Sequence, residues 1–295
     1  MNCLVTGGLG FIGSHLVDGL LMEGHDVIIV DNFSTGKFQH AFISTHNVDI
    51  SDYTALSTLF DFYTIDYIFH TAALPKVQFS IENPIKTNVA NIVGTLNILE
   101  LAKLNGVKRV IYSSSSSVYG NTDIIPIRED CPVSPMSPYA LQKLVGEYYC
   151  QLYYDLYKLE TVSLRYFNVY GNRMPETGAY CSVLSTFLKQ RREGKKLSIV
   201  PDGNQKRDFT FVGDVVVANI AAMEIAPGKG EVINIGSGVN YSVNEIAKLI
   251  GGETEFIPPR VEPKETLADN SLAHKLLSWG PTMTVEKWLE EIERW

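Results

Sequence analysis

The stretch Asn2-Cys3-Leu4-Val5-Thr6-Gly7-Gly8-Leu9-Gly10-Phe11-Ile12-Gly13 decides the fold. Its first five residues form a short apolar run, and residues 11–23 carry isoleucine and leucine at helical spacing. A second apolar run covers residues 26–31. Strands that are covered on both faces lose their polar alternation, and parallel strands need a helical crossover between them. The stretch therefore predicts a buried βαβ unit.

The alternation of apolar runs and amphipathic segments continues along the chain. We expect strands near 66–71, 107–113 and 161–167, and helices near 85–104 and 138–157. After residue 168 the segments shorten, with helices expected at 181–193, 213–224, 242–250 and 284–294 and strands at 197–200 and 232–235. This order is typical of an open sheet with helices on both faces.

The sequence thus predicts an α/β fold, with a doubly wound (Rossmann) parallel sheet and a smaller, interleaved C-terminal α/β domain. We expect the first domain to cover residues 1–167, with a segment of about 209–236 returning to it. The second domain is expected to cover residues 168–208 and 237–295.

Composition limits the function classes. The 295 residues are 45% hydrophobic and carry 25 Lys+Arg against 33 Asp+Glu, a net charge of −8. These values indicate a globular chain and argue against broad nucleic-acid binding, which needs a basic face. No apolar run approaches the roughly 18–20 residues that cross a bilayer, and the N-terminus lacks the basic region of a signal peptide. The four cysteines and six histidines show no metal-binding spacing, so we expect reduced thiols, no metal and a cytoplasmic protein.

The glycine-rich turn predicts a dinucleotide site. Gly7, Gly10 and Gly13 lie between a strand and a helix, where small residues let the backbone approach a pyrophosphate. The free N–H groups of the helix N-terminus then face the phosphates. Asp31 ends the second strand, where a carboxylate accepts the ribose hydroxyls of NAD and repels the 2′-phosphate of NADP. The pattern therefore favours NAD. NADP stays open as the alternative, because one nearby cation, Lys37, could pair with its 2′-phosphate.

A tyrosine and a lysine share one helix face. Ser137 is a good N-cap and Pro138 suits the first turn, so Tyr139 and Lys143 fall at positions i and i+4. A tyrosine with a pKa of about 10 is a poor base at neutral pH. A nearby ammonium group and a positive nicotinamide ring both favour the phenolate, so we expect a lowered pKa and a general base.

These motifs together resemble the extended short-chain dehydrogenase/reductases, and among them the NAD-dependent nucleotide-sugar epimerases. The similarity covers nearly the whole chain. Its marks are Gly7 to Gly13, Asp31-Asn32-Phe33-Ser34-Thr35-Gly36, His70-Thr71-Ala72-Ala73, Ser113 to Gly120, Tyr139 with Lys143, Arg165-Tyr166-Phe167-Asn168-Val169-Tyr170-Gly171 and Arg207-Asp208-Phe209.

The resemblance implies roles for single residues. Ser115 would be the catalytic serine, with Ser114 as the alternative, and Lys143 would also hold the nicotinamide ribose. The implied cofactor residues are Gly7, Gly10, Phe11, Ile12, Gly13, Asp31, Asn32, Ser34, Thr35, Gly36, Asp49, Ile50, Ala72, Ala73, Lys76, Asn91, Tyr139, Lys143, Tyr166 and Phe167. The implied substrate residues are Ser115, Tyr139, Asn168, Arg207, Arg260 and Asp269, in which the two arginines would clamp a diphosphate.

The resemblance also narrows the reaction. Related dehydratases carry an Asp-Glu pair before Val-Tyr-Gly, and related decarboxylases keep the Glu, whereas Ser116 and Ser117 stand there in this chain. We therefore expect 4-epimerisation of a UDP-sugar of the UDP-glucose/UDP-galactose type. The alternatives are another nucleotide-sugar oxidoreductase or dehydratase, and a non-catalytic NAD-sensing module. The resemblance further implies a homodimer, formed by pairing the helices near 85–104 and 138–157 across a two-fold axis.

Overall fold

A seven-stranded parallel sheet forms the centre of the molecule. The computed structural model describes residues 1–41, 43–176, 181–258 and 263–292. Within these residues the strand order is β11-β6-β5-β4-β1-β2-β3. The strands are β1 (Asn2–Thr6), β2 (Asp26–Asp31), β3 (Ser44–Asn47), β4 (Tyr67–His70), β5 (Arg109–Ser115), β6 (Glu160–Tyr166) and β11 (Lys229–Ile235). The predicted doubly wound α/β fold is confirmed.

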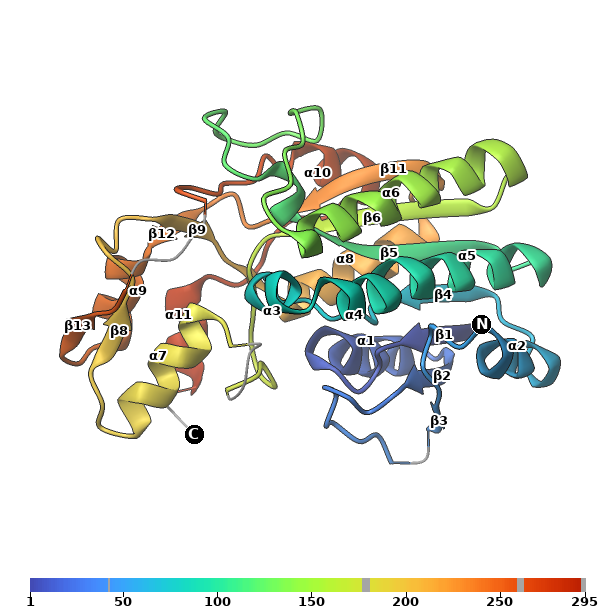
Figure 1. Cartoon of the computed structure of the whole chain (residues 1–295), viewed down its shortest axis with the longest axis horizontal. Coiled ribbons are helices and arrows are strands. Elements are labelled where there is room, and N and C mark those ends of the chain that lie inside the picture. Colours follow the sequence, from blue (N-terminus) through green and yellow to red (C-terminus); the bar gives the residue numbers. More distant parts are fainter. Residues whose placement is uncertain (42, 177–180, 259–262, 293–295) are drawn as a thin grey trace.

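Helices cover both faces of the sheet because successive strand residues point to opposite sides. Val5 and Ile29 face a core shared with α1 (Phe11–Met22) and α8 (Val212–Glu224). Leu4 and Ile28 face a core shared with α2 (Tyr53–Phe62), α5 (Gly94–Leu104) and α6 (Pro138–Tyr157). Figure 1 shows α5 and α6 running side by side along the sheet.

The helix predicted at 85–104 is interrupted. It consists of α4 (Pro84–Asn88), a π-helical turn (Val89–Val93) and α5, and a further short helix, α3 (Val77–Glu82), precedes it. Asn91 lies in the π-helical turn, and its side chain bonds the Leu74 backbone at 2.8 and 3.2 Å. Hydrophobic periodicity reports only where apolar residues recur. It does not reveal a polar residue that hydrogen-bonds a neighbouring loop, so the sequence predicted one regular helix.

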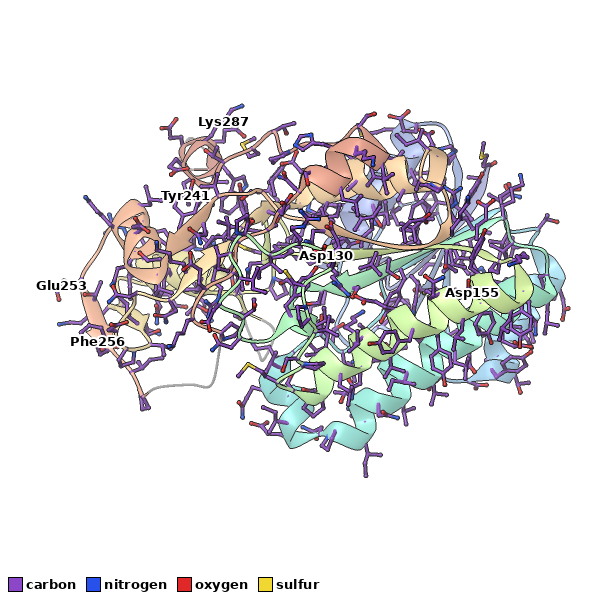
Figure 2. The ribbon with its side chains drawn as sticks, turned by 90° about the horizontal axis from the view of Figure 1, so that it is seen from above. Asp130, Asp155, Tyr241, Glu253, Phe256 and Lys287 are labelled. Carbon is purple, nitrogen blue, oxygen red and sulfur yellow. The ribbon has the colours of Figure 1, made fainter. Side chains whose placement is uncertain are left out.

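Short elements form a second lobe with its own core, at one end of the molecule in Figure 1. They are β7 (Val169–Tyr170), α7 (Val183–Arg192), β8 (Leu197–Ile199), β9 (Lys206–Asp208), β10 (Thr210–Phe211), β12 (Asn240–Ser242), α9 (Val243–Ile250), β13 (Thr254–Phe256) and α11 (Val285–Ile292). Phe187, Ile246 and Trp288 are buried in this core. Figure 2 places Tyr241 and Phe256 in this lobe, at the opposite end from Asp155 on α6.

The packing of the helices and strands agrees only in part with the predicted domain division. α8 packs on α1 and β11 pairs with β6, which is the arrangement expected for residues 209–236. However, α10 (Ser271–Leu277) comes from the segment assigned to the second domain and packs on α8 and β11. The exact division therefore stays a prediction. The strand predicted at 107–113 also runs two residues later, so Ser115 ends it.

A glycine allows α6 to lie close to β5. A Cβ atom on Gly146 would come within 2.2 Å of the Tyr112 hydroxyl and 2.4 Å of its ring carbon Cζ. Because Tyr139 and Lys143 lie on the same helix, this contact sets their distance from the end of β5.

We expect Gly146→Ala to destabilise the protein, because α6 must move away from the Tyr112 ring. Overpacking of this kind costs about 1–3 kcal/mol, and each kcal/mol lowers Tm by about 2–4 °C in a chain approaching this size. Calorimetry of Gly146→Ala measures the change in Tm. Asp155→Ala, at an exposed position on the same helix, is the control. Equal Tm values for the two variants would contradict the close-contact argument.

Candidate active site

Most of the predicted cofactor residues follow the carboxyl ends of strands in the central sheet. Residues 7–13 follow β1, residues 31–36 end and follow β2, Asp49 and Ile50 follow β3, residues 72–76 follow β4, Ser115 ends β5, and Phe167 and Asn168 follow β6. The strand order reverses between β1 and β4, and ligands of doubly wound sheets bind at such a switch point. The topology thus brings segments that are far apart in sequence to one crevice.

The turn after β1 fits a dinucleotide pyrophosphate. Gly7 has a φ of +70°, and a Cβ on Gly13 would lie 2.1 Å from the Gly7 carbonyl oxygen. Gly10 is the N-cap of α1, and no side chain caps that helix end. The N–H groups of the first turn, at Phe11 and Ile12, are therefore left for an anion.

The loop after β2 is tied to the glycine turn through Asp31. The two carboxylate oxygens of Asp31 accept from the backbone N–H groups of Leu9 at 3.1 Å and Phe33 at 2.8 Å. Asn32 donates to Asp49 at 2.8 Å and accepts from the Ser34 backbone at 3.1 Å. Ser34, Thr35 and Gly36 continue this loop. The structure thus brings these predicted cofactor residues together beside the glycine turn.

Three predicted cofactor residues are engaged elsewhere in the protein. The Ile50 side chain is buried in the core between the sheet and α5. The Lys76 ammonium donates to the Cys181 carbonyl at 3.0 Å. Asn91 also donates to Gln142 at 2.8 Å, in addition to its bonds with Leu74. Their contact with a cofactor stays a prediction.

Ser115, Tyr139 and Lys143 meet between β5 and α6. Ser137 caps α6 through the Ala140 N–H, as predicted, and Pro138 begins the helix. The Lys143 ammonium donates to the Ser113 carbonyl at 2.6 Å and lies 4.8 Å from the centre of the Tyr112 ring. Tyr139 and Lys143 are both buried, and Ser115 is half-buried.

The predicted lowering of the Tyr139 pKa does not occur in the protein alone. Burial of the phenol raises the pKa of Tyr139 to about 12, and a hydrogen bond with Ser115 lowers it only in part. Burial also lowers the pKa of Lys143 to about 8. The sequence argument counted the nearby ammonium group but not desolvation, which disfavours both charged forms.

The adjacent Ser114 has a different partner. Its hydroxyl donates to Glu147, which forms a buried ion pair with Arg165 at 2.7 and 2.9 Å. The Arg165 guanidinium lies 4.6 Å from the centre of the Tyr119 ring. Ser114 therefore belongs to a buried network behind β5, whereas Ser115 is bonded to Tyr139.

Tyr166 and Phe167 are deeply packed. The Tyr166 hydroxyl lies 3.1 Å from Ser113 Oγ and accepts from Asn219 Nδ2 at 2.8 Å, and burial raises its pKa to about 12. The Phe167 ring is fully buried, with its backbone N–H bonded to the Ile235 carbonyl. Any cofactor contact of this pair would therefore involve the backbone or a ring edge.

A buried carboxylate organises the predicted substrate side. Asp208 accepts from the backbone N–H groups of Ser237 at 2.8 Å, Gly238 at 3.0 Å and Ala268 at 3.0 Å, and from the Ser237 hydroxyl. Asn168, with a φ of +23°, donates to the Asp208 carbonyl at 2.8 Å.

The other predicted substrate residues flank this carboxylate in sequence or lie near its partners. Arg207 precedes Asp208 in β9 and is largely buried. Asp269 follows Ala268, and its carboxylate accepts from the Ser271 backbone at 2.9 Å. Arg260 lies outside the described residues.

The sequence analysis missed three organising residues. Asp208 and His70 were quoted only as parts of motifs, and Glu147 was not considered. The signal for Asp208 was its place between Arg207 and Phe209, where a charged residue interrupts a short strand-like run. Glu147 lies four residues after Lys143, on the buried face of the same helix, which is the signal that would have found it.

The chain belongs to the NAD dependent epimerase/dehydratase family, whose model matches residues 3–236. The family match and the fold place it among the short-chain dehydrogenase/reductase enzymes that act on nucleotide sugars. The putative UDP-glucose 4-epimerase of Methanocaldococcus jannaschii is 37% identical to it over 99% of this chain and 97% of that protein.

Solved structures of similar enzymes agree with this fold. The UDP-glucose 4-epimerase of Thermotoga maritima, solved with UDP-glucose, has a TM-score of 0.96 and 36% identity, covering 100% of this chain and 99% of that one. The UDP-glucuronic acid 4-epimerase of Bacillus cereus, solved with UDP-glucuronic acid and NAD, has a TM-score of 0.88 and 34% identity, covering 98% and 97%. Relatives also include the UDP-glucuronic acid decarboxylase 1 of Xenopus tropicalis, 33% identical over 98% of this chain and 70% of that protein. The family is NAD-dependent, and its members differ in substrate and reaction.

The described part of the chain carries neither a metal cluster nor a membrane-spanning helix. No group of three or more His, Cys, Asp or Glu side chains gathers there in a way that would hold a metal ion. No helix in the same part of the chain is long and apolar enough to span a bilayer. The predicted cytoplasmic location remains untested.

His70 makes the floor of the site sensitive to acid. Its ring is fully buried between the hydroxyls of Thr6 at 2.7 Å and Thr95 at 2.9 Å, and burial lowers its pKa to about 3. The neutral ring is therefore favoured by folding. Its stabilising contribution is complete above the ordinary pKa of about 6.5 and is lost as the pH falls towards 3.

We expect protonation of His70 alone to lower the free energy of unfolding of the wild type by about 3 kcal/mol when the pH falls from 7 to 4.5. Urea unfolding across that range, for the wild type and His70→Gln, isolates the contribution, because all other titrating groups are common to both proteins. The wild-type curve should fall more steeply. Parallel curves would refute the assignment.

Proposed function

We propose that the chain is a NAD-dependent 4-epimerase of a UDP-sugar, of the UDP-glucose/UDP-galactose type. The observation that carries the proposal is the group at the end of β5, in which Ser115 lies beside the buried phenol of Tyr139 and Lys143 lies one turn further along α6. The names of similar proteins, which include UDP-glucose 4-epimerases, support the same reaction.

The three side chains would act on one sugar hydroxyl. Tyr139 accepts the proton of the C4 hydroxyl and later returns it, while Ser115 hydrogen-bonds the same oxygen and orients it. Lys143 holds the nicotinamide ribose. Bound NAD supplies a reversible hydride acceptor at C4. Because burial alone keeps the Tyr139 pKa near 12, ionisation of the phenol would depend on cationic charge that arrives with the bound ligands.

The surroundings of Ser115 disfavour elimination and decarboxylation. Ser116 and Ser117 follow it in a short 3-10 helix, and neither carries a carboxylate. Glu147 contacts the serine run, but it bonds Ser114 and is neutralised by Arg165. A general acid for expelling water is therefore missing at the positions where the related dehydratases carry it.

The substrate would lie between the sheet edge and the second lobe. Asn168 and Asp269 lie at the loops that Asp208 fixes, and Arg207 precedes Asp208 in β9. We propose that Asn168, Arg207 and Arg260 hold the diphosphate, and that Asp269 meets the nucleoside ribose. An arginine suits this role because its guanidinium group makes paired bonds to phosphate oxygens.

The wild-type protein should interconvert UDP-glucose and UDP-galactose, or an acetamido or uronate pair, without added NAD. Tyr139→Phe should lower the rate at least about 100-fold, as expected for loss of a general base, and should retain its NAD. Chromatography of the UDP-sugars measures conversion, and Tyr154→Phe on the same helix is the matched control.

Each rival function predicts a different result in this assay. A dehydratase or decarboxylase would give a product that has lost water or carbon dioxide by mass spectrometry. A non-catalytic module would bind NAD and convert none of the three sugar pairs. An unaffected Tyr139→Phe variant would contradict the proposed base.

We also propose that two copies pair through an exposed apolar face. The face consists of Ile85, Val89 and Val93 on the α4–α5 segment and Leu141, Tyr148, Leu152 and Leu156 on α6. These residues repeat at helical spacings of four and seven on two neighbouring helices. Exposed apolar stripes of this length indicate an interface, and a two-fold axis would make a four-helix contact.

Leu152→Asp should convert the dimer into a monomer, because the charge would be buried without a partner. Phe62→Asp on α2 is the control, since Phe62 is 81% exposed and lies on a different surface. Light scattering after gel filtration gives the mass of each protein. A wild type that is monomeric, or a dimeric Leu152→Asp variant, would contradict the proposed interface.

A further inference from the structure

Three segments meet at Asp18 on α1: the helix itself, the residues that follow β7, and the loop that carries Phe38 and His40. Arg173 follows β7, and its guanidinium group lies 2.6 Å from one Asp18 carboxylate oxygen. The other oxygen lies 3.3 Å from Nδ1 of His40. The same guanidinium stacks on Phe38, with its central carbon 3.6 Å from the ring centre. One residue earlier, the Asn172 carbonyl is 2.8 Å from His15 Nε2, also on α1.

The loop that Arg173 covers rests directly on the glycine turn. The backbone N–H groups of Lys37 and Phe38 donate to the Leu9 carbonyl at 3.0 and 3.2 Å. Gly36 packs so closely that a Cβ there would come within 2.7 Å of Leu9 and 2.9 Å of the Gly10 nitrogen. The loop therefore cannot lift from the turn without breaking these backbone bonds and uncovering the Phe38 ring.

The contacts of Arg173 differ from those of an ordinary surface ion pair. Such pairs contribute little because both side chains are free to move in water. Here the guanidinium side chain is 26% exposed, it is held on one side by a carboxylate and on the other by an aromatic face, and its backbone has a φ of +63°. A non-glycine residue keeps that conformation only where its surroundings hold it.

We propose that Arg173 latches the loop of residues 33–40 onto α1 and thereby slows release of NAD. Arg173 is then a positioning residue, and its effect falls on the residence time of the cofactor. The inference rests on the proposed NAD dependence and on the predicted contact of Asp31 and residues 32–36 with that cofactor. It also suits the proposed reaction, because an enzyme that returns the hydride it removes gains nothing by releasing the cofactor between turnovers.

The test is the rate at which bound NAD exchanges with an excess of isotopically labelled NAD, followed by mass spectrometry of the intact complex. Arg173→Ala should speed exchange at least tenfold, while kcat and KM for the UDP-sugar stay unchanged at saturating NAD. The exchange rate of Arg173→Lys should lie between those of the wild type and Arg173→Ala, because lysine keeps the ion pair but loses the flat face that stacks on Phe38. Arg128→Ala, which removes an exposed arginine that pairs with Asp130, is the control and should exchange like the wild type.

Two further measurements separate a latch from a general loss of stability. Asp18→Asn should also speed exchange, and its effect should be smaller when Arg173 is already alanine, because both substitutions remove the Arg173–Asp18 ion pair. Added salt should speed exchange of the wild type more than that of Arg173→Ala, because the ion pair is partly exposed.

The outcomes distinguish failure of the latch from failure of the cofactor placement. If the wild type retains NAD and Arg173→Ala exchanges it equally slowly, the latch is wrong. A lower Tm with activity that added NAD does not restore would also overturn it, because Arg173 would then serve folding. If Asp31→Ala and the wild type bind NAD equally well, the placement at residues 31–36 is wrong and the latch fails with it.

Discussion

The close packing of α6 against β5 is the constraint on which the site depends. Gly146 leaves no room for a side chain beside Tyr112, and Tyr139 and Lys143 lie on the same helix. The Lys143 ammonium in turn donates a hydrogen bond to the Ser113 carbonyl of β5. Strand and helix therefore fix three reactive groups without any of them lying on a mobile loop.

Burial in this contact has an electrostatic consequence. It opposes the charged form of both Tyr139 and Lys143, so the protein by itself holds the phenol protonated. In the proposed reaction, proton abstraction would therefore depend on the positively charged nicotinamide ring of the bound cofactor. Behind the strand, the Glu147–Arg165 pair is internally neutral and satisfies Ser114, so it does not compete with Tyr139 for the substrate proton.

The sequence predicted the regular parts of this arrangement well. β1, β2 and α6 have the predicted bounds, because apolar runs, the glycine turn and a Ser-Pro helix start are local signals. The π-helical turn at Asn91, the bonding partners of Asp208 and the Arg173 contacts could not be predicted, because each depends on residues distant in sequence. The effect of burial on the Tyr139 pKa could not be predicted for a related reason, since burial is a property of the whole fold.

A deuterium label at C4 of the UDP-sugar tests the account most directly. If the site only moves one proton and one hydride at C4, the wild-type protein should convert UDP-[4-²H]glucose, or a labelled uronate or acetamido relative, into its 4-epimer with the deuterium retained at C4. Product that has lost the label to solvent, or that has lost water or carbon dioxide, would contradict the account.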